Sequence, residues 1–199
     1  SNDVSVIDTA TNTLIDSVPV VGLYPQDVAV HQDGSRVYAV SVDTLSVIDS
    51  STNMVIATVP VGGPYGVSVN PAGTRIYVAN FSSTTVSVIN ASTNSVIDTV
   101  QVGNSPSVPA VNPAGSRVYV GNYGDDTVSV IDTATNTVIK TVSVEDQPEG
   151  AEVHPAGARV YVTNYVSNTV SVIDTETDTV IATVPVGDGP ASVAIGPAV

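Results

Sequence analysis

The segment TVSVIDTATNTVI, residues 127–139, recurs along the chain with few changes. Its copies end their SVID-like phrase at Asp8, Asp49, Asn90, Asp132 and Asp174. The steps between these positions are 41, 41, 42 and 42 residues. A constant period near 42 is typical of an array of equal units, each built from one small motif.

Each unit contains four short segments that read as strands. In one unit they are YGVSVN (65–70), RIYVAN (75–80), VSVIN (86–90) and SVIDTVQV (95–102), separated by PAGT, FSSTT and ASTN. The segments are rich in Val, Ile and Tyr and are bounded by Gly, Pro, Asn and Ser, which is the pattern of strands and tight turns. Four antiparallel strands in a unit of about 40 residues make one propeller blade. The sequence therefore predicts an all-β protein, a β-propeller of four-stranded antiparallel blades. Parallel β-helices and leucine-rich solenoids are the alternatives, but their periods are shorter.

The blades are expected to form a single domain over residues 1–199. The predicted divisions are a blade part at 1–20, complete blades at about 21–61, 62–102, 103–144 and 145–186, and an innermost strand at 187–199. Joining the two ends would give a split, partial fifth blade without its second strand. Three arrangements remain open: a ring closed by both ends, a segment of a longer array, and an assembly of several chains. Unpaired backbone in the gap is unfavourable, which favours the segment of a longer array.

The charge balance excludes several partners. The chain has 19 acidic and 5 basic residues and a net charge of −14. Nucleic-acid grooves and anionic lipid surfaces both require clustered Lys and Arg, so neither partner is expected. Cysteine is absent, which excludes disulfides and thiolate metal sites. No apolar run reaches the ~18 residues of a membrane span and no signal peptide is recognised.

The strand phrases also resemble a known family. RIYVAN, RVYVGN and RVYVTN, each followed by a TVSVID-like phrase, are similar to the YVTN-repeat β-propellers, and YVTN itself stands at 161–164. The resemblance extends over essentially the whole chain. It implies a propeller of the kind found in surface-layer and other exported proteins of archaea and bacteria, where seven blades are usual. It further implies an extracellular or cell-surface location, with the periplasm as an alternative, and a role as scaffold or binding module.

Residues present in every unit are expected to support the architecture. An arginine precedes each VYV-like strand, and an aspartate ends most SVID phrases. We expect each arginine to bond a carboxylate or a turn carbonyl and each aspartate to cap its turn. These structural residues are Arg36, Arg75, Arg117, Arg159, Asp8, Asp49, Asp132 and Asp174. His31 and His154 occupy the place of Asn70 and Asn112 and are expected to share their hydrogen-bonding role.

Residues that differ between units are expected to carry function. The fourth-to-first linkers and the second-to-third loops vary most, and alternating strand direction places both sets on one face. Loops on a rigid scaffold commonly carry specificity. The predicted ligand or partner residues are Tyr24, Gln26, Asp27, Tyr65, Glu149 and Glu152. For Phe81, Tyr123 and Tyr165 blade-to-blade packing is favoured over exposed aromatic contacts.

The sequence favours a non-enzymatic scaffold or recognition module that binds a protein or a cell-surface glycan through the variable face. Association with further chains, to complete the ring or an array, is a second kind of partner contact. No catalytic motif, metal set or cofactor motif is found, so no catalytic residue, metal or cofactor is predicted. The alternative is a propeller hydrolase or lactonase with an axial metal. A redox or quinoprotein role would rest on analogy alone.

Overall fold

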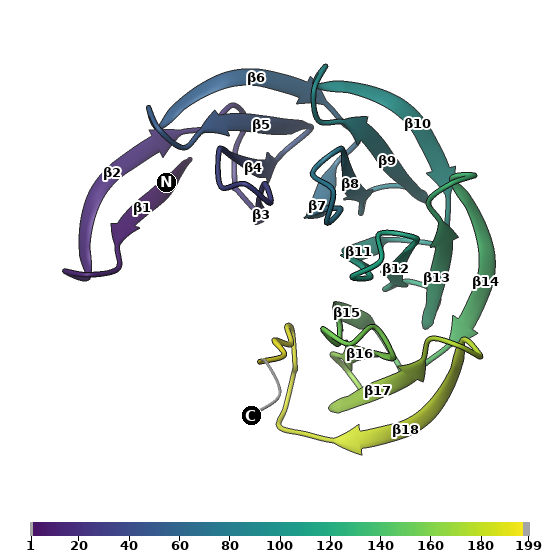
Figure 1. The fold of residues 1–199 in the computed structure, drawn as a ribbon. Coiled ribbons are helices and arrows are strands. Elements are labelled where there is room, and N and C mark those ends of the chain that lie inside the picture. Colours follow the sequence, from purple (N-terminus) through teal and green to yellow (C-terminus); the bar gives the residue numbers. More distant parts are fainter. Residues whose placement is uncertain (1, 197–199) are drawn as a thin grey trace.

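The structure is a computed structural model, and it describes residues 2–196. Four four-stranded antiparallel sheets and one two-stranded hairpin follow one another around an open arc (Figure 1). This confirms the predicted all-β propeller architecture. Within residues 2–196 no helix could cross a membrane.

The strands of each unit are consecutive in the chain, and the first strand of each complete blade is innermost (Figure 1). The N-terminal hairpin consists of β1 (Asp3–Asp8) and β2 (Thr13–Pro19). The first blade consists of β3 (Asp27–Val30), β4 (Arg36–Ser41), β5 (Thr44–Asp49) and β6 (Met54–Pro60). The second consists of β7 (Pro64–Val69), β8 (Arg75–Asn80), β9 (Thr85–Asn90) and β10 (Ser95–Gln101). The third consists of β11 (Pro106–Val111), β12 (Arg117–Asn122), β13 (Thr127–Asp132) and β14 (Thr137–Ser143). The fourth consists of β15 (Pro148–Val153), β16 (Arg159–Asn164), β17 (Thr169–Asp174) and β18 (Thr179–Pro185).

The two ends of the arc do not meet. The hairpin β1–β2 forms a sheet of its own, and the C-terminal segment lies at the other end of the arc (Figure 1). Residues 187–196 form no strand, although an innermost strand was predicted at 187–199; residues 197–199 lie outside the described part. A strand needs a hydrogen-bonded neighbour, and the described chain offers this segment none. The ring closed by both ends is therefore not the arrangement of this structure.

The hydrophobic core lies between blades. Within residues 2–196 four apolar clusters are found, and each joins two adjacent units. Tyr38, Tyr77 and Tyr119, from the second strands of the first three blades, are fully buried. Their equivalent in the fourth blade, Tyr161, is only partly buried, because no described blade follows it. Stacking like blades thus buries faces that a single small sheet would expose.

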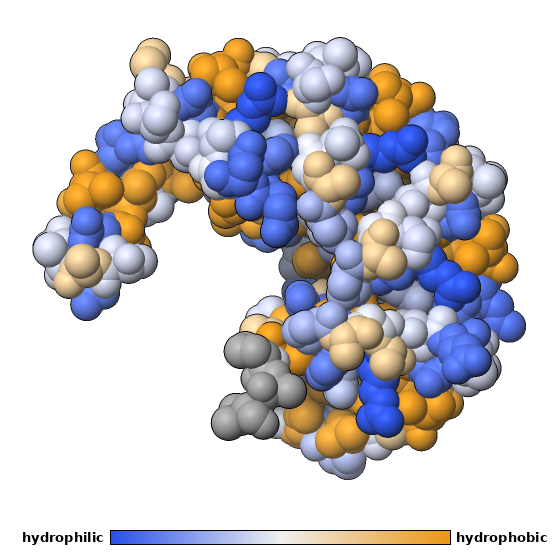
Figure 2. Space-filling model, viewed as in Figure 1, coloured by the Kyte–Doolittle hydropathy of each residue, from blue (hydrophilic) through white to orange (hydrophobic). Residues whose placement is uncertain are grey.

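An irregularity recurs in the outer strand pair of every unit. The register shifts by one residue there and leaves one isoleucine of the outermost strand unpaired. These isoleucines are Ile15, Ile56, Ile97, Ile139 and Ile181, and each is at least 47 % exposed. A β-bulge increases strand twist and here turns apolar side chains outward. Apolar surface shows along the outer circumference of the arc and over the hairpin (Figure 2).

Candidate functional site: the variable-loop face

The recurring arginines connect each blade to the next. Arg36 Nη1 donates to the carbonyl of Ala91 at 2.6 Å, and Arg75 Nη1 donates to the carbonyl of Thr133 at 2.6 Å. Arg117 Nη1 donates to the carbonyl of Thr175 at 2.8 Å and to both carboxylate oxygens of Asp178 at 3.0 Å. The side chain of Arg159 is exposed and donates no hydrogen bond within residues 2–196. These contacts fasten adjacent blades on one face of the arc.

The SVID aspartates cap their turns. Oδ1 of Asp132 accepts from the backbone N–H groups of Ala134 and Thr135 at 3.0 and 2.9 Å. These bonds favour the ionised form and hold the pKa of Asp132 below its ordinary value. Asp8, Asp49 and Asp174 make the same pair of bonds. The turns they cap connect the third and fourth strands, on the face that carries the arginine contacts.

The histidines also lie on this constant face. His31 contacts Asp33 through Nδ1 at 2.7 Å and the carbonyl of Gly73, in the next blade, through Nε2 at 2.8 Å. His154 Nδ1 accepts from the backbone N–H of Ala156 at 3.0 Å. Both rings therefore make contacts within their own turn, as the asparagines at the equivalent positions do, and His31 also contacts the next blade. No group of three or more potential metal ligands occurs within residues 2–196.

The variable linkers and loops meet on the opposite face. The backbone N–H of Tyr123 donates to the carbonyl of Ser105 at 3.1 Å, and that of Tyr165 donates to the carbonyl of Gln147 at 2.9 Å. Each bond joins a second-to-third loop to the linker that precedes the same blade. The asparagine before each aromatic residue is buried, and its amide bonds hydroxyls in the third strand, as Asn122 does with Ser129 at 2.9 Å. The aromatic side chains are thereby set in place at the top of rigid strands.

Four aromatic side chains and one carboxylate line a pocket of about 300 Å³ on this face. The lining residues are Tyr65, Phe81, Tyr123, Glu149 and Tyr165. The rings form a row: the centroids of Tyr65 and Phe81 are 5.3 Å apart, and those of Phe81 and Tyr123 are 5.7 Å apart. The row crosses the second and third blades, and Tyr165 lines the pocket from the fourth. We call it the aromatic pocket.

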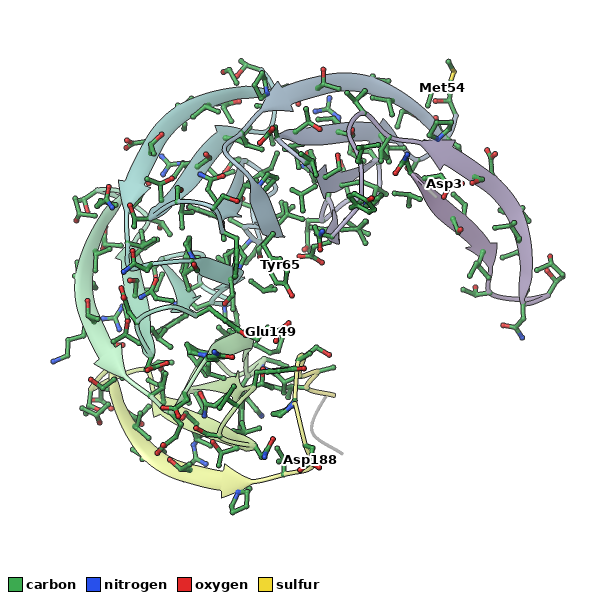
Figure 3. All side chains as sticks on the ribbon, turned by 180° about the vertical axis from the view of Figure 1, so that it is seen from behind. Asp3, Met54, Tyr65, Glu149 and Asp188 are labelled. Carbon is green, nitrogen blue, oxygen red and sulfur yellow. The ribbon has the colours of Figure 1, made fainter. Side chains whose placement is uncertain are left out.

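One hydrogen bond spans the pocket across a whole blade. Tyr65 Oη donates to Glu149 Oε1 at 2.7 Å, although the two residues belong to the second and fourth blades. Figure 3 shows both side chains next to each other at the inner rim of the arc. The equivalent position of the blade between them holds Ser107, whose small side chain is buried, so the rim is open at that point. Burial, and then the bond to Glu149, raise the pKa of Tyr65 to about 12.

The other predicted residues lie outside the pocket. Asp27 is at the start of β3, and its Oδ2 accepts from the backbone N–H of Val67 in the next blade at 2.9 Å; burial raises the pKa of this carboxyl. Glu152 lies on β15 with its side chain accessible to solvent, and partial desolvation raises the pKa of its carboxyl. Gln26 is exposed next to Asp27. Of the six predicted residues, the structure thus brings Tyr65 and Glu149 together.

Tyr24 occupies a special backbone position. Its φ is 53°, and its side chain is 69 % exposed. In all five linkers the residue before the proline has a left-handed backbone conformation with positive φ, and in two linkers this residue is a glycine, Gly63 or Gly189. A left-handed tyrosine is strained, and such strain is often found at binding sites.

The comparisons with known proteins agree with this architecture. A YNCE-like β-propeller family model matches residues 107–198, a little under half of the chain. Hydrazine synthase of Kuenenia stuttgartiensis is structurally similar, with a TM-score of 0.78, 25 % sequence identity and 83 % of this chain covered. This chain spans 50 % of the length of that solved chain. The fold recurs in 1477 solved chains, so the likeness alone points to no single activity. No match was found among curated proteins. The repeat phrases, the blade architecture and both likenesses show a β-propeller fold and support a resemblance to the YVTN-type propellers.

Proposed function

We propose that this propeller is a non-enzymatic binding module of an exported or cell-surface protein. In this proposal it engages a protein or a glycan through the variable-loop face. A propeller in general provides a rigid scaffold or binding surface, and its loops carry specificity. The observation that carries the proposal is the aromatic pocket, because aromatic side chains that remain accessible to solvent are enriched at recognition surfaces; Tyr165 is exposed and the other three rings are partly buried.

The two faces support this division. On the constant face the recurring side chains, except Arg159 in the last blade, are occupied by contacts within or between blades, as Arg117 and Asp132 show. On the variable face the position after each linker proline changes from copy to copy, and Tyr65 and Glu149 are the large residues that fill it at the pocket. The blades do not need these two residues, because the neighbouring copy has Ser107 in the same place.

The test is a binding comparison with variants taken from the repeat itself. Glu149→Ser and Tyr65→Ser introduce the residue of the neighbouring blade. Pull-down with purified cell-wall glycans and exported proteins is expected to lose the partner in both variants. Glu176→Gln, on the constant face, makes a matched change of charge and is expected to keep the partner. Equal binding after exchange of every linker would refute the proposal.

A further inference from the structure

The aromatic pocket has the composition of a site for an organic cation. Aromatic rings present a negative face that attracts ammonium and guanidinium groups, and a carboxylate adds a full negative charge. Here four rings and the carboxylate of Glu149 surround about 300 Å³. No lysine or arginine of this chain lines the pocket, so the negative groups have no cationic partner there.

The hydrogen bonding of Glu149 leaves it able to receive such a group. Its Oε1 accepts from Tyr65, whereas Oε2 accepts no hydrogen bond within residues 2–196. The bond from Tyr65 fixes the carboxylate at the end of the aromatic row. A planar guanidinium can stack on aromatic faces and donate to a carboxylate at once, which matches a row of rings that ends in one free carboxylate oxygen.

The charge of the whole chain favours the same ligand. The net charge is −14, with 5 basic residues in 199. A strongly acidic surface attracts basic partners and repels acidic ones, and salt weakens both effects. Glycans of neutral sugars would gain from the rings but not from this charge.

We propose that the aromatic pocket receives the guanidinium or ammonium head of a basic side chain presented by a protein partner. This inference rests on the proposed function and specifies the class of partner for its binding face. Tyr65, Phe81, Tyr123 and Tyr165 form the cation–π walls, and Glu149 neutralises the charge. The linkers and loops beside the pocket contact the neighbouring residues of the partner segment.

The experiment is an NMR titration of the intact chain, followed by the ring signals of its tyrosines. The probe is N-acetylarginine amide, and N-acetylcitrulline amide is its uncharged isostere. The arginine compound is expected to shift the pocket signals and to bind about tenfold or more tightly than the citrulline compound. N-acetyllysine amide is the second basic probe. Raising the salt concentration is expected to weaken both basic probes.

Variants separate the pocket from general attraction to an acidic protein. Glu149→Gln keeps an acceptor for Tyr65 but removes the charge, and Tyr123→Leu removes one ring. Each is expected to weaken arginine binding about threefold or more, since the first loses the ion pair and the second loses one cation–π contact. Glu176→Gln is the matched control, because it removes the same charge outside the pocket, on the constant face, and it is expected to bind as the original chain does.

Two results would overturn the inference. Equal binding of the arginine and citrulline compounds would show that charge is not recognised. Binding of chitobiose or cellobiose that depends on Tyr123, without binding of either basic probe, would assign the pocket to sugars. The second result would leave the proposed function standing as glycan recognition. If neither proteins nor glycans bind the variable-loop face, both the proposed function and this inference are refuted.

Discussion

The contact of Arg117 with the next blade allows a quantitative prediction. The guanidinium donates to the carbonyl of Thr175 and to the carboxylate of Asp178 in the fourth blade. The Arg117 and Asp178 side chains are 31 % and 11 % exposed. Arg117→Ala removes these bonds and leaves a largely buried carboxylate without its cation.

The expected loss follows from the kind of bond and its exposure. Hydrogen bonds to charged groups contribute about 1.5 to 3 kcal/mol, and an uncompensated buried charge adds to the loss. Partial exposure of Arg117 reduces this through solvent screening, so we expect the free energy of unfolding to fall by about 2 to 3 kcal/mol. For a chain of this size that corresponds to a fall in melting temperature of roughly 5 to 10 °C.

Arg159→Ala provides the internal control. Arg159 has the same place in its blade but is exposed and bonds no further blade within residues 2–196. Its removal is expected to change stability by about 0.5 kcal/mol or less. Thermal and urea unfolding of both variants, followed by circular dichroism, measures the difference. Equal losses for the two arginines would refute the assignment of Arg117 as a link between blades.

Three further predictions concern other contacts. Gly66→Ala places a Cβ 2.6 Å from a backbone Cα of the next blade's inner strand, and it is expected to lower the free energy of unfolding by about 1 to 3 kcal/mol. Gly62 has open space around it, so Gly62→Ala is expected to leave the free energy of unfolding unchanged. Urea unfolding measures both variants. Asp27→Asn keeps the acceptor for the backbone N–H of Val67. Because folding raises the pKa of Asp27, ionisation of this carboxyl opposes folding, and the variant is expected to be more stable than the original chain at neutral pH. The difference is expected to vanish below the ordinary aspartate pKa of 3.8, which unfolding measured as a function of pH tests. Glu149→Gln is expected to lower the pKa of Tyr65 from about 12 while burial keeps it above its ordinary value, which NMR titration of the ring carbon measures; an unchanged pKa would contradict the contact.

The architecture could be predicted because it is repeated. One phrase that recurs every 41 or 42 residues, with strand residues between turn residues, determines both the blade and its neighbours. The aspartates that end the phrase, such as Asp132, act within a few residues of their own position, and local contacts of this kind can be inferred from local sequence.

The pocket could be predicted only in part. Copy-to-copy variation singled out Tyr65 and Glu149, but not their mutual bond, because they are 84 residues apart and meet only through the curvature of three blades and the small size of Ser107 between them. Phe81 and Tyr123 were interpreted as packing residues. They do contact each other across blades, and the same contact makes them the wall of the pocket.

The exposed isoleucines escaped prediction for a different reason. A strand read as a regular alternation does not reveal a bulge, and the one-residue shift beside Ile139 turns an apolar side chain outward. The left-handed backbone of Tyr24 was also not predicted, because tyrosine is not a residue type that indicates a positive φ. The glycines at the equivalent position of two other linkers, Gly63 and Gly189, are the signal that could have indicated it.

The division between a supporting face and a binding face is tested most directly by thermal unfolding of Glu149→Gln with and without N-acetylarginine amide. A ligand at ten times its dissociation constant stabilises the folded state by about 1.4 kcal/mol, or roughly 3 to 5 °C. We predict that the variant melts at the temperature of the original chain without ligand and gains clearly less from the ligand. A lower melting temperature without ligand, together with the full gain on adding it, would show that Glu149 supports the blades and does not bind, and would contradict the account.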